Sequence, residues 1–539
     1  MTNKRPSVLV LGGGLAGLTA ARSLATHGFD VVLLEKSVQA GGKAGSHKAD
    51  STHGDPAPGV EYEHGYHIFA TWYDNVLPLL KELGITLKPI SRWHYKTMLD
   101  GWKGLYLPST PGELIDVLRN SPLSVPDTLL YFYFCLDMIG RPLSQRAALD
   151  RVTRLGLMRS CWYATETLPV IEEESILKAA AVPVHEMSAQ TAKILSSYFL
   201  YTLKPSNLLR TFSAKADPQP SLYMLQGDLQ QTFIEPYVKQ VVADHVVIHY
   251  EHTVTKIALT PATNGSAQST IAYVEVTTPA GAKAFSADAF VVATPLDVAQ
   301  HLLNVRELHA AEPAVGHINR LRTAPMAALH LTLCGPAPKL PTEHCFLMGG
   351  EYGLSFIDLT THWTDAPYTL SFIASNFAPL LYLQRAEQYE QLINEITRFL
   401  PITKADVKHW CLFPNNERGE QLFVNTVGSW PDRPNVKSKH VRNLFFAGDW
   451  VKNKVDLACM EGAVSSALNS AREVALAYRD APGVSIPDGA RVAGRYPPWI
   501  IRLLVLLLSP LALLTYWWAT RRSKAKTAAA TAHQQRSLG

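Results

Sequence analysis

The stretch VLVLGGGLAGLTAARSLATHGFDVVLLEK, residues 8–36, decides the fold of this chain. Residues 8–11 are four branched apolar residues in a row, which predicts a buried parallel strand. Three glycines follow in the spacing GxGxxG, at Gly12, Gly14 and Gly17. Gly12 permits a tight turn, Gly14 lets the backbone approach a pyrophosphate, and Gly17 allows a helix over residues 15–26 to pack closely on the strand. The N-terminus of that helix would hold the phosphates.

A second buried strand, DVVLLEK, ends at Glu35, which lies 18 residues beyond Gly17. An acid at this point of a dinucleotide-binding unit accepts hydrogen bonds from the adenosine ribose, and its charge repels a 2′-phosphate. The pattern therefore predicts a dinucleotide site. The alternative is a glycine-rich structural turn.

The next residues, SVQAGGKAGS, indicate which dinucleotide is bound. A long flavin dinucleotide needs further backbone contacts along its length, and Gly41, Gly42 and Lys43 would supply them. Here the sequence resembles the flavin-containing amine oxidase superfamily, in which a GG[RK] turn follows the ribose acid. The segment EYEHGYHIFATWYDNVLPLLKELG narrows the resemblance to the plant-type phytoene and ζ-carotene desaturase branch. The residues that match its E-x-G-x-HIF stretch are Glu63, Gly65, His67, Ile68 and Phe69.

His67 is the candidate catalytic residue of this stretch, and it has two interpretations. One is a packed, hydrogen-bonded histidine in a turn, and the other is a residue beside the flavin. No cluster of metal ligands accompanies it in the sequence. The catalytic residues otherwise stay unknown at this point.

From residue 111 to residue 223 the pattern becomes helical and irregular, with aromatic residues crowded in LLYFYFCLDMIG and SSYFLYTL. An inserted helical substrate region fits this pattern. The rings of Tyr131, Phe132, Tyr133 and Phe134 are either ordinary core or part of a tunnel for an apolar substrate.

The chain then returns to the nucleotide fold. By resemblance to the superfamily, Val254 would lie against the adenine through its backbone, and ADAFVVATP, residues 287–295, would form a strand and turn below the nucleotide. TAPMAALHLTLCGP should begin the sheet of the substrate domain. Amine-oxidising members generally carry a lysine in such a strand, whereas residues 323–338 contain none. This departure disfavours an amine oxidase.

We call the strand, glycine turn and helix of residues 8–36 the N-terminal seat of the cofactor. A second such arrangement, the C-terminal seat, lies in RNLFFAGDWVKNKVDLACMEGAVSSALNSA, residues 442–471. A buried strand ends in a turn at Gly448, and a helix with small residues on one side follows. In this superfamily such a strand and helix complete the flavin site, so the two seats would form one site. Asp449 would bond the ribityl or pyrophosphate region, and backbone amides of residues 460–463 would face the flavin O2, where negative charge grows on reduction.

The resemblance thus implies FAD as cofactor. No cysteine or histidine lies in a recognisable flavinylation motif, so we expect noncovalent binding. The residues expected to bind FAD are Gly12, Gly14, Leu15, Ala16, Gly17, Glu35, Lys36, Gly42, Lys43, Val254, Gly448, Asp449, Met460, Gly462 and Ala463.

Composition agrees with a large globular enzyme. The chain has 539 residues, 47% of them hydrophobic, and a net charge of +4, which gives no excess of the kind that nucleic-acid binding requires. Its six cysteines are scattered without a CxxC pair, which argues against a metal site or a disulfide framework. No secretory leader pattern precedes residue 8, so we expect the catalytic part to be cytoplasmic.

The predicted fold class is α/β, with a Rossmann-like FAD-binding domain interleaved with an α+β substrate domain. The predicted FAD-binding segments are 1–110, 224–300 and 428–480. The substrate segments are a helical region, 111–223, and a domain of sheet and helices, 301–427. A linker, 481–498, a membrane segment, 499–519, and a basic flexible tail, 520–539, would follow.

The membrane segment WIIRLLVLLLSPLALLTYWWA is the most apolar stretch of the chain. It is long enough to cross a hydrocarbon core of ~30 Å. Crossing would carry the basic residues after it out of the cytoplasm, against the positive-inside preference. Arg502 and Pro510 also lie within it and fit a bent segment that enters one leaflet. In either form it would attach the protein to the cytoplasmic side of a membrane.

The leading functional hypothesis is an FAD-dependent desaturase that removes a hydride from a long apolar isoprenoid. The alternatives are a redox-neutral carotenoid isomerase, a hydroxysqualene dehydroxylase-type enzyme, a polar-amine oxidase, and a tethered flavoprotein without turnover. The expected partners are an apolar lipid substrate, the membrane and a quinone as electron acceptor, with no nucleic acid.

Overall fold

The computed structural model describes residues 5–90, 93–98, 100–105, 111–141, 146–200, 222–260, 269–337, 340–364, 367–418, 421–492 and 498–537. Its first unit is a five-stranded parallel sheet in the order β11-β2-β1-β15-β23. The strands are β1 Ser7–Leu11, β2 Asp30–Leu34, β11 Val247–His249, β15 Ala289–Val292 and β23 Leu444–Phe446. This confirms the predicted strands and the Rossmann-like sheet.

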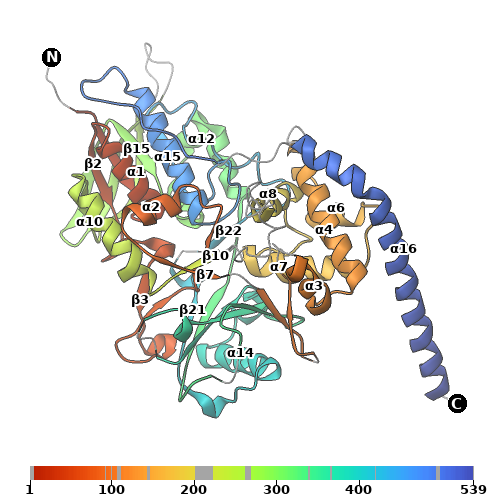
Figure 1. Ribbon diagram of the computed structural model, residues 1–539. Coiled ribbons are helices and arrows are strands. Elements are labelled where there is room, and N and C mark those ends of the chain that lie inside the picture. Colours follow the sequence, from red (N-terminus) through yellow and green to blue (C-terminus); the bar gives the residue numbers. More distant parts are fainter. Residues whose placement is uncertain are drawn as a thin grey trace.

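Successive side chains of β1 point to opposite faces of this sheet, so they belong to two different hydrophobic clusters. Val8 and Val10 pack into the cluster that contains α1 Leu15–Ala25 and α15 Met460–Ala477. Leu9 and Leu11 pack on the other face, against the strands β12 Thr253–Thr260 and β13 Thr270–Thr278 and the helix α11 Leu296–Leu302. Figure 1 shows α1 and α15 side by side, so the two predicted seats are on the same face of the sheet.

The second unit is an eight-stranded sheet in the order β4-β21-β17-β20-β19-β18-β8-β9, and α14 Arg385–Phe399 packs on one of its faces. Its strands are β4 Gly54–Asp55, β8 Trp93–Lys96, β9 Trp102–Gly104, β17 Ala327–Leu333, β18 His344–Leu347, β19 Leu354–Asp358, β20 Thr369–Ala374 and β21 Val407–Pro414. The expected strand after residue 323 is therefore present.

One predicted boundary needs correction. We assigned residues 1–110 to the FAD-binding part, but β4, β8 and β9 belong to the eight-stranded sheet. β4 pairs with β21 and β8 pairs with β18, and both partners lie more than two hundred residues further along the chain, so no local pattern could indicate this pairing.

Smaller strands and helices connect these units. The strands are β3 Ser46–Lys48, β5 Glu61–Glu63, β6 Phe69–Ala70, β7 Leu87–Ile90, β10 Leu222–Leu225, β12 Thr253–Thr260, β13 Thr270–Thr278, β14 Gly281–Phe285, β16 Arg322–Ala324 and β22 Leu422–Val424. The helices are α2 Val76–Glu82, α10 Glu235–Ala243, α11 Leu296–Leu302, α12 Arg306–Ala311 and α13 Pro313–Gly316.

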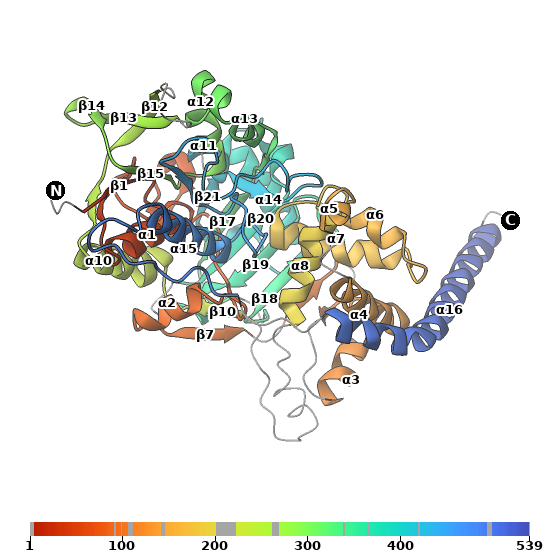
Figure 2. The same cartoon turned by 90° about the horizontal axis from the view of Figure 1, so that it is seen from above.

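The predicted helical region forms a separate layer beside the sheets (Figures 1 and 2). Its helices are α3 Pro111–Asn120, α4 Val125–Gly140, α5 Arg146–Asp150, α6 Arg154–Arg159, α7 Thr167–Ala180 and α8 Ala189–Leu200. Ser124 caps α4 by accepting a hydrogen bond from the Asp127 amide, and Pro126 lies in its first turn, as is typical of a helix start.

The C-terminal helix α16 Pro498–Ser537 packs its beginning on α4. Arg502 Nη1 donates to Asp137 Oδ1 at 2.7 Å, and the Tyr133 hydroxyl donates to the Val505 carbonyl at 3.3 Å. A Cβ on Gly140 would lie 3.1 Å from the Arg502 backbone nitrogen, so this glycine allows the close approach of the two helices. Charge pairing thereby explains the one arginine within the apolar segment.

The part of α16 from Trp499 to Arg522 is long and apolar enough, by length and composition, to cross a membrane. Pro510 lies within the helix, which bends along its length in Figure 1. We expected a basic flexible tail from residue 520, whereas the helix continues to Ser537. The reason is the alanine, lysine, arginine and glutamine content after residue 520, because these residues favour helix.

Candidate active site

A cavity of about 740 Å³ lies between the two seats and extends to the helical region. Its nucleotide end begins at the turn between β1 and α1. Gly12 has φ +108°, and a Cβ there would lie 2.9 Å from the Ala293 carbonyl oxygen. A Cβ on Gly14 would meet its nearest neighbour at 4.0 Å, so the turn is open toward the cavity. A Cβ on Gly17 would lie 1.8 Å from the Gly12 carbonyl, so this glycine serves helix packing.

Glu35 stands at the carboxyl end of β2 and is 7% exposed. Its Oε2 accepts a hydrogen bond from the Gly13 amide at 2.7 Å, and its Oε1 accepts one from the Ser37 amide at 2.8 Å. A carboxylate offers about four acceptor sites, so lone pairs remain for a ligand hydroxyl. Because Glu35 lines the cavity, it can both shape the loop and bind a ribose.

The second glycine pair closes the same end of the cavity. Gly41 and Gly42 have φ of +128° and +54°, which a residue with a side chain rarely adopts. The Gly41 amide donates to the Gly13 carbonyl at 2.9 Å and so ties the two glycine turns together. Beside them, Lys43 Nζ lies 3.1 Å from Asp449 Oδ2. This ion pair joins the N-terminal seat to the C-terminal seat.

The C-terminal seat is the loop 448–459 between β23 and α15. Gly448 has φ +144°, and its amide donates to the Ser466 hydroxyl at 2.8 Å. Cys459 is the N-cap of α15, with its sulfur accepting a hydrogen bond from the Gly462 amide at 3.4 Å. The first-turn amides of a helix lack carbonyl partners within it, so α15 and α1 both direct positive helix ends at the cavity.

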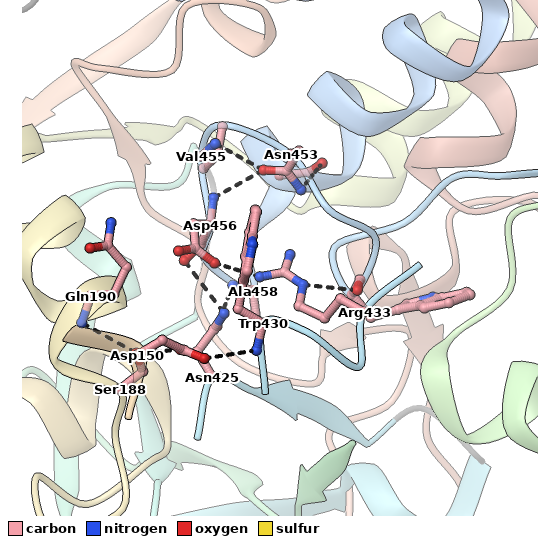
Figure 3. Close-up of polar contacts among 12 residues, drawn as sticks. Asp150, Ser188, Gln190, Asn425, Trp430, Arg433, Asn453, Val455, Asp456 and Ala458 are labelled. Atoms are coloured by element: carbon pink, nitrogen blue, oxygen red, sulfur yellow. Dashed lines mark hydrogen bonds and ion pairs between the residues drawn. The ribbon is translucent and has the colours of Figure 1, made fainter. Parts of the chain in front are cut away.

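A buried arginine holds the loop 448–459 in place (Figure 3). Arg433 is 2% exposed, and its guanidinium donates to the carbonyls of Asp449, Trp450 and Val451 at 3.1, 3.0 and 2.8 Å. It also donates to Asp456 Oδ1 at 2.5 Å. Burial lowers the pKa of Arg433, and the Asp456 carboxylate opposes that shift. Arg433 therefore positions Asp449 without lining the cavity.

Most of the predicted cofactor residues line this cavity. They are Gly12, Gly14, Leu15, Ala16, Glu35, Lys36, Gly42, Lys43, Val254, Gly448, Asp449, Met460 and Ala463. Gly17 and Gly462 do not line it and serve packing instead, since a Cβ on Gly462 would lie 2.6 Å from the Leu457 carbonyl.

Thr294, which lies in the predicted turn of residues 287–295, also lines the cavity, although the sequence did not single out its hydroxyl. Its Oγ1 is buried and has no hydrogen-bond partner in the described part of the chain. A buried hydroxyl of this kind is one that a bound ligand can satisfy. The glycine turns, the acid, two helix N-termini and this hydroxyl together fit a dinucleotide cofactor.

Residues 15–475 match the family model of flavin-containing amine oxidoreductases, in agreement with these features of the cavity. The chain belongs to the flavin-containing amine oxidoreductase family. It is a flavoprotein oxidoreductase by that membership, and a flavin is the cofactor that the family implies.

Within the family, the chain is similar to carotenoid desaturases. It is 24% identical to 15-cis-phytoene desaturase of Solanum lycopersicum, covering 87% of this chain and 78% of that protein. It is 22% identical to a probable zeta-carotene desaturase of Synechococcus elongatus, covering 86% and 98%. The solved structure of cyclohexylamine oxidase from Brevibacterium oxydans shares the fold, with a TM-score of 0.61, 14% identity and coverage of 88% and 99%.

The part of the cavity beyond the two glycine-containing seats has a mostly apolar wall on α4 and a more polar wall on α7. Tyr131 and Phe132 line the cavity, while Tyr133 and Phe134 are 7% and 1% exposed and lie in the core around α16. The four rings therefore divide into two that line the cavity and two that belong to the core. From α7, the cavity is lined by Glu172, Ser175 and Lys178.

His67 lines the cavity too, and it is held by the acid of its own motif. Its Nδ1 lies 2.8 Å from Glu63 Oε2, and Glu63 Oε1 accepts a hydrogen bond from the Leu229 amide at 2.8 Å. Glu63 is 3% exposed. On β17, His330 Nε2 lies 2.7 Å from the Glu63 carbonyl oxygen.

Proposed function

We propose that this flavoenzyme binds FAD noncovalently and dehydrogenates a long apolar isoprenoid to form a carbon–carbon double bond. The observation that carries the proposal is the cavity itself, which continues from the flavin seats to the aromatic and aliphatic wall of α4. An elongated hydrocarbon needs such a wall, whereas a small polar amine does not. The similarity to proteins named phytoene and zeta-carotene desaturases supports the same substrate class.

Each end of the FAD would have its own set of residues. Gly12, Gly14, Leu15 and Ala16 would hold the pyrophosphate at the start of α1, and Glu35 and Lys36 would hold the ribose. Val254 would contact the adenine. Lys43 and Asp449 would bind the ribityl and pyrophosphate region, and Met460 and Ala463 would place the positive end of α15 beside the ring.

When bound, FAD supplies the acceptor for the two electrons that leave the substrate as a hydride. The chain must then provide an acceptor for the proton that leaves the neighbouring carbon. His67 fits this role because Glu63 occupies its Nδ1. A neutral histidine that donates from Nδ1 has a free lone pair at Nε2, and we assign proton acceptance to that atom. Glu63 would stabilise the charged imidazolium that results.

The helix α16 would attach the enzyme to the cytoplasmic side of a membrane. It exposes a series of large apolar side chains, including Leu503, Leu504, Leu507, Leu511 and Leu514. A water-insoluble substrate would enter from the bilayer, and a membrane quinone would reoxidise the flavin.

The test is to incubate the purified holoenzyme with polyene hydrocarbons and squalene-derived lipids and to identify products by mass. Loss of two hydrogens per turnover, with one flavin reduction each, is expected. An unchanged mass with a shifted double-bond geometry would instead identify an isomerase, and oxidation of amines would identify an amine oxidase. In a His67→Gln variant we expect kcat to fall ~10²–10⁴-fold while flavin stays bound.

A further inference from the structure

The wall of the cavity formed by α7 is unexpectedly polar for an enzyme that holds a hydrocarbon. Glu172, Ser175 and Lys178 follow one another at intervals of three residues, which places them on one face of the helix, and all three line the cavity. On the opposite helix α4, three of the four lining residues, Phe132, Cys135 and Leu136, are apolar, and the fourth, Tyr131, carries a hydroxyl. The two walls therefore differ in chemistry.

The charges of the α7 face are already balanced. Glu172 Oε2 accepts a hydrogen bond from Arg154 Nε at 2.8 Å, and both residues are at most 2% exposed. Lys178 pairs with Glu174 and donates to the Leu347 carbonyl at 2.7 Å. The negative charges of the two carboxylates thus balance the positive charges of the two cations. A charged ligand group would leave one charge uncompensated in this buried wall, which is costly.

Donors and acceptors nevertheless remain on the α7 face. The Lys178 ammonium carries three protons, and two are directed to Glu174 and Leu347. The Ser175 hydroxyl has one long contact, 3.3 Å from the Tyr95 hydroxyl. Tyr131 faces Glu172 from α4, and burial followed by this carboxylate raises the pKa of Tyr131. The protonated Tyr131 hydroxyl is directed at Glu172, so a ligand hydroxyl would insert between the two. A neutral group that both donates and accepts matches this set.

We propose that the substrate of this enzyme is an isoprenoid that carries a hydroxyl group, and that Glu172, Ser175 and Tyr131 bind that hydroxyl. This inference rests on the proposed function and narrows its substrate. A hydroxyl has one proton to donate to the carboxylate and two lone pairs to accept from the serine or tyrosine. The hydrocarbon chain then extends along α4 toward the flavin seats.

The test is equilibrium binding of two tritiated C30 polyenes, one a hydrocarbon and the other its alcohol of equal length, to the holoenzyme in detergent micelles. We expect the alcohol to bind ~10-fold more tightly than the hydrocarbon, as one hydrogen bond to a charged group provides. Ser175→Ala and Tyr131→Phe should each reduce this preference to ~3-fold or less without changing hydrocarbon binding. Leu136→Ala, on the apolar wall, should weaken both lipids equally.

Glu172→Gln should abolish the preference, but it also leaves Arg154 without its carboxylate, so the serine and tyrosine variants carry the test. Equal affinity of the wild type for the two lipids, or a preference that survives in both variants, would overturn the inference. If the alcohol binds preferentially but no lipid is dehydrogenated, the proposed function fails and the hydroxyl site stands. If the hydrocarbon is dehydrogenated without any preference for the alcohol, the proposed function stands and the hydroxyl site fails.

Discussion

Glu35→Gln tests the nucleotide seat without changing the volume of the side chain. In the wild type both carboxylate oxygens accept hydrogen bonds from backbone amides, those of Gly13 and Ser37, at 2.7 and 2.8 Å. A glutamine has one carbonyl oxygen, so it can accept from one of these amides and must direct its NH₂ group at the other. The variant therefore gains a contact between two donors inside the loop, and it loses the negative charge that would strengthen a hydrogen bond from the ribose hydroxyl.

The loss of one hydrogen bond to a charged group amounts to ~1.5–3 kcal/mol, which corresponds to about one to two factors of ten in affinity. We expect the dissociation constant of FAD to rise by that amount, measured by the fluorescence of flavin released on dilution. Asp449→Asn, which removes the charge facing Lys43, should weaken FAD at the other seat. Asp30→Asn is the matched control, because Asp30 is an exposed acid at the opposite end of the same strand.

A Glu35→Gln enzyme that retains FAD within about threefold of the wild-type affinity would refute the assigned role of this carboxylate, since a threefold change is well below one hydrogen bond. A loss that the Asp30→Asn control shares would indicate a general effect on β2 instead.

Four further outcomes are expected. Denaturation of the purified protein should release its yellow chromophore into the supernatant, and flavin that stays with the precipitate would contradict noncovalent binding. Arg433→Met should lower the unfolding free energy by ~3–5 kcal/mol, measured in urea, because it leaves Asp456 with one cation and frees three carbonyls. Burial lowers the pKa of His344 to about 3 in the folded protein, whereas it is about 6.5 in the unfolded chain. The unfolded chain therefore binds this proton first, so the folded protein is most stable above pH 6.5 and loses stability as the pH falls from 6.5 toward 3. His344→Gln should therefore flatten the decline of Tm below pH 6.5. Truncation after Pro510 keeps the contacts of Val505 with α4 and should release the protein from membranes with FAD bound, as flotation with liposomes would show; truncation after Pro498 should also destabilise α4.

The sequence predicted those parts of the site that are local in the chain. The strand, glycine turn, helix and acid of residues 8–36 follow from hydrophobic periodicity and from the conformations that glycine allows, and the structure confirms them. The helix after Gly448 follows for the same reason. Lys43 and Asp449 were each expected at the cofactor, but their ion pair was not, because it joins residues 406 positions apart.

What the sequence could not indicate depends on such distant contacts. Arg433 lies between prolines in a segment without periodicity, and its importance appears once the loop 448–459 is folded around it. Likewise, the three-residue spacing of Glu172, Ser175 and Lys178 predicts a polar helix face, which in most helices would face water. That this face lines a cavity follows from the packing of α7 against β18 and α4.

The helix α4 links the apolar helix α16 to the cavity, because its two sides have different partners. Tyr131 and Cys135, one turn apart, line the cavity. Tyr133 and Asp137, also one turn apart, contact α16. One helix is roughly 10 Å across with its side chains, so the proposed membrane attachment would place the bilayer about that distance from the substrate. A displacement of α16 must therefore shift the same helix that forms the apolar wall. We therefore expect that a change in how α16 contacts the membrane also changes how substrate enters the cavity, because α4 contacts both.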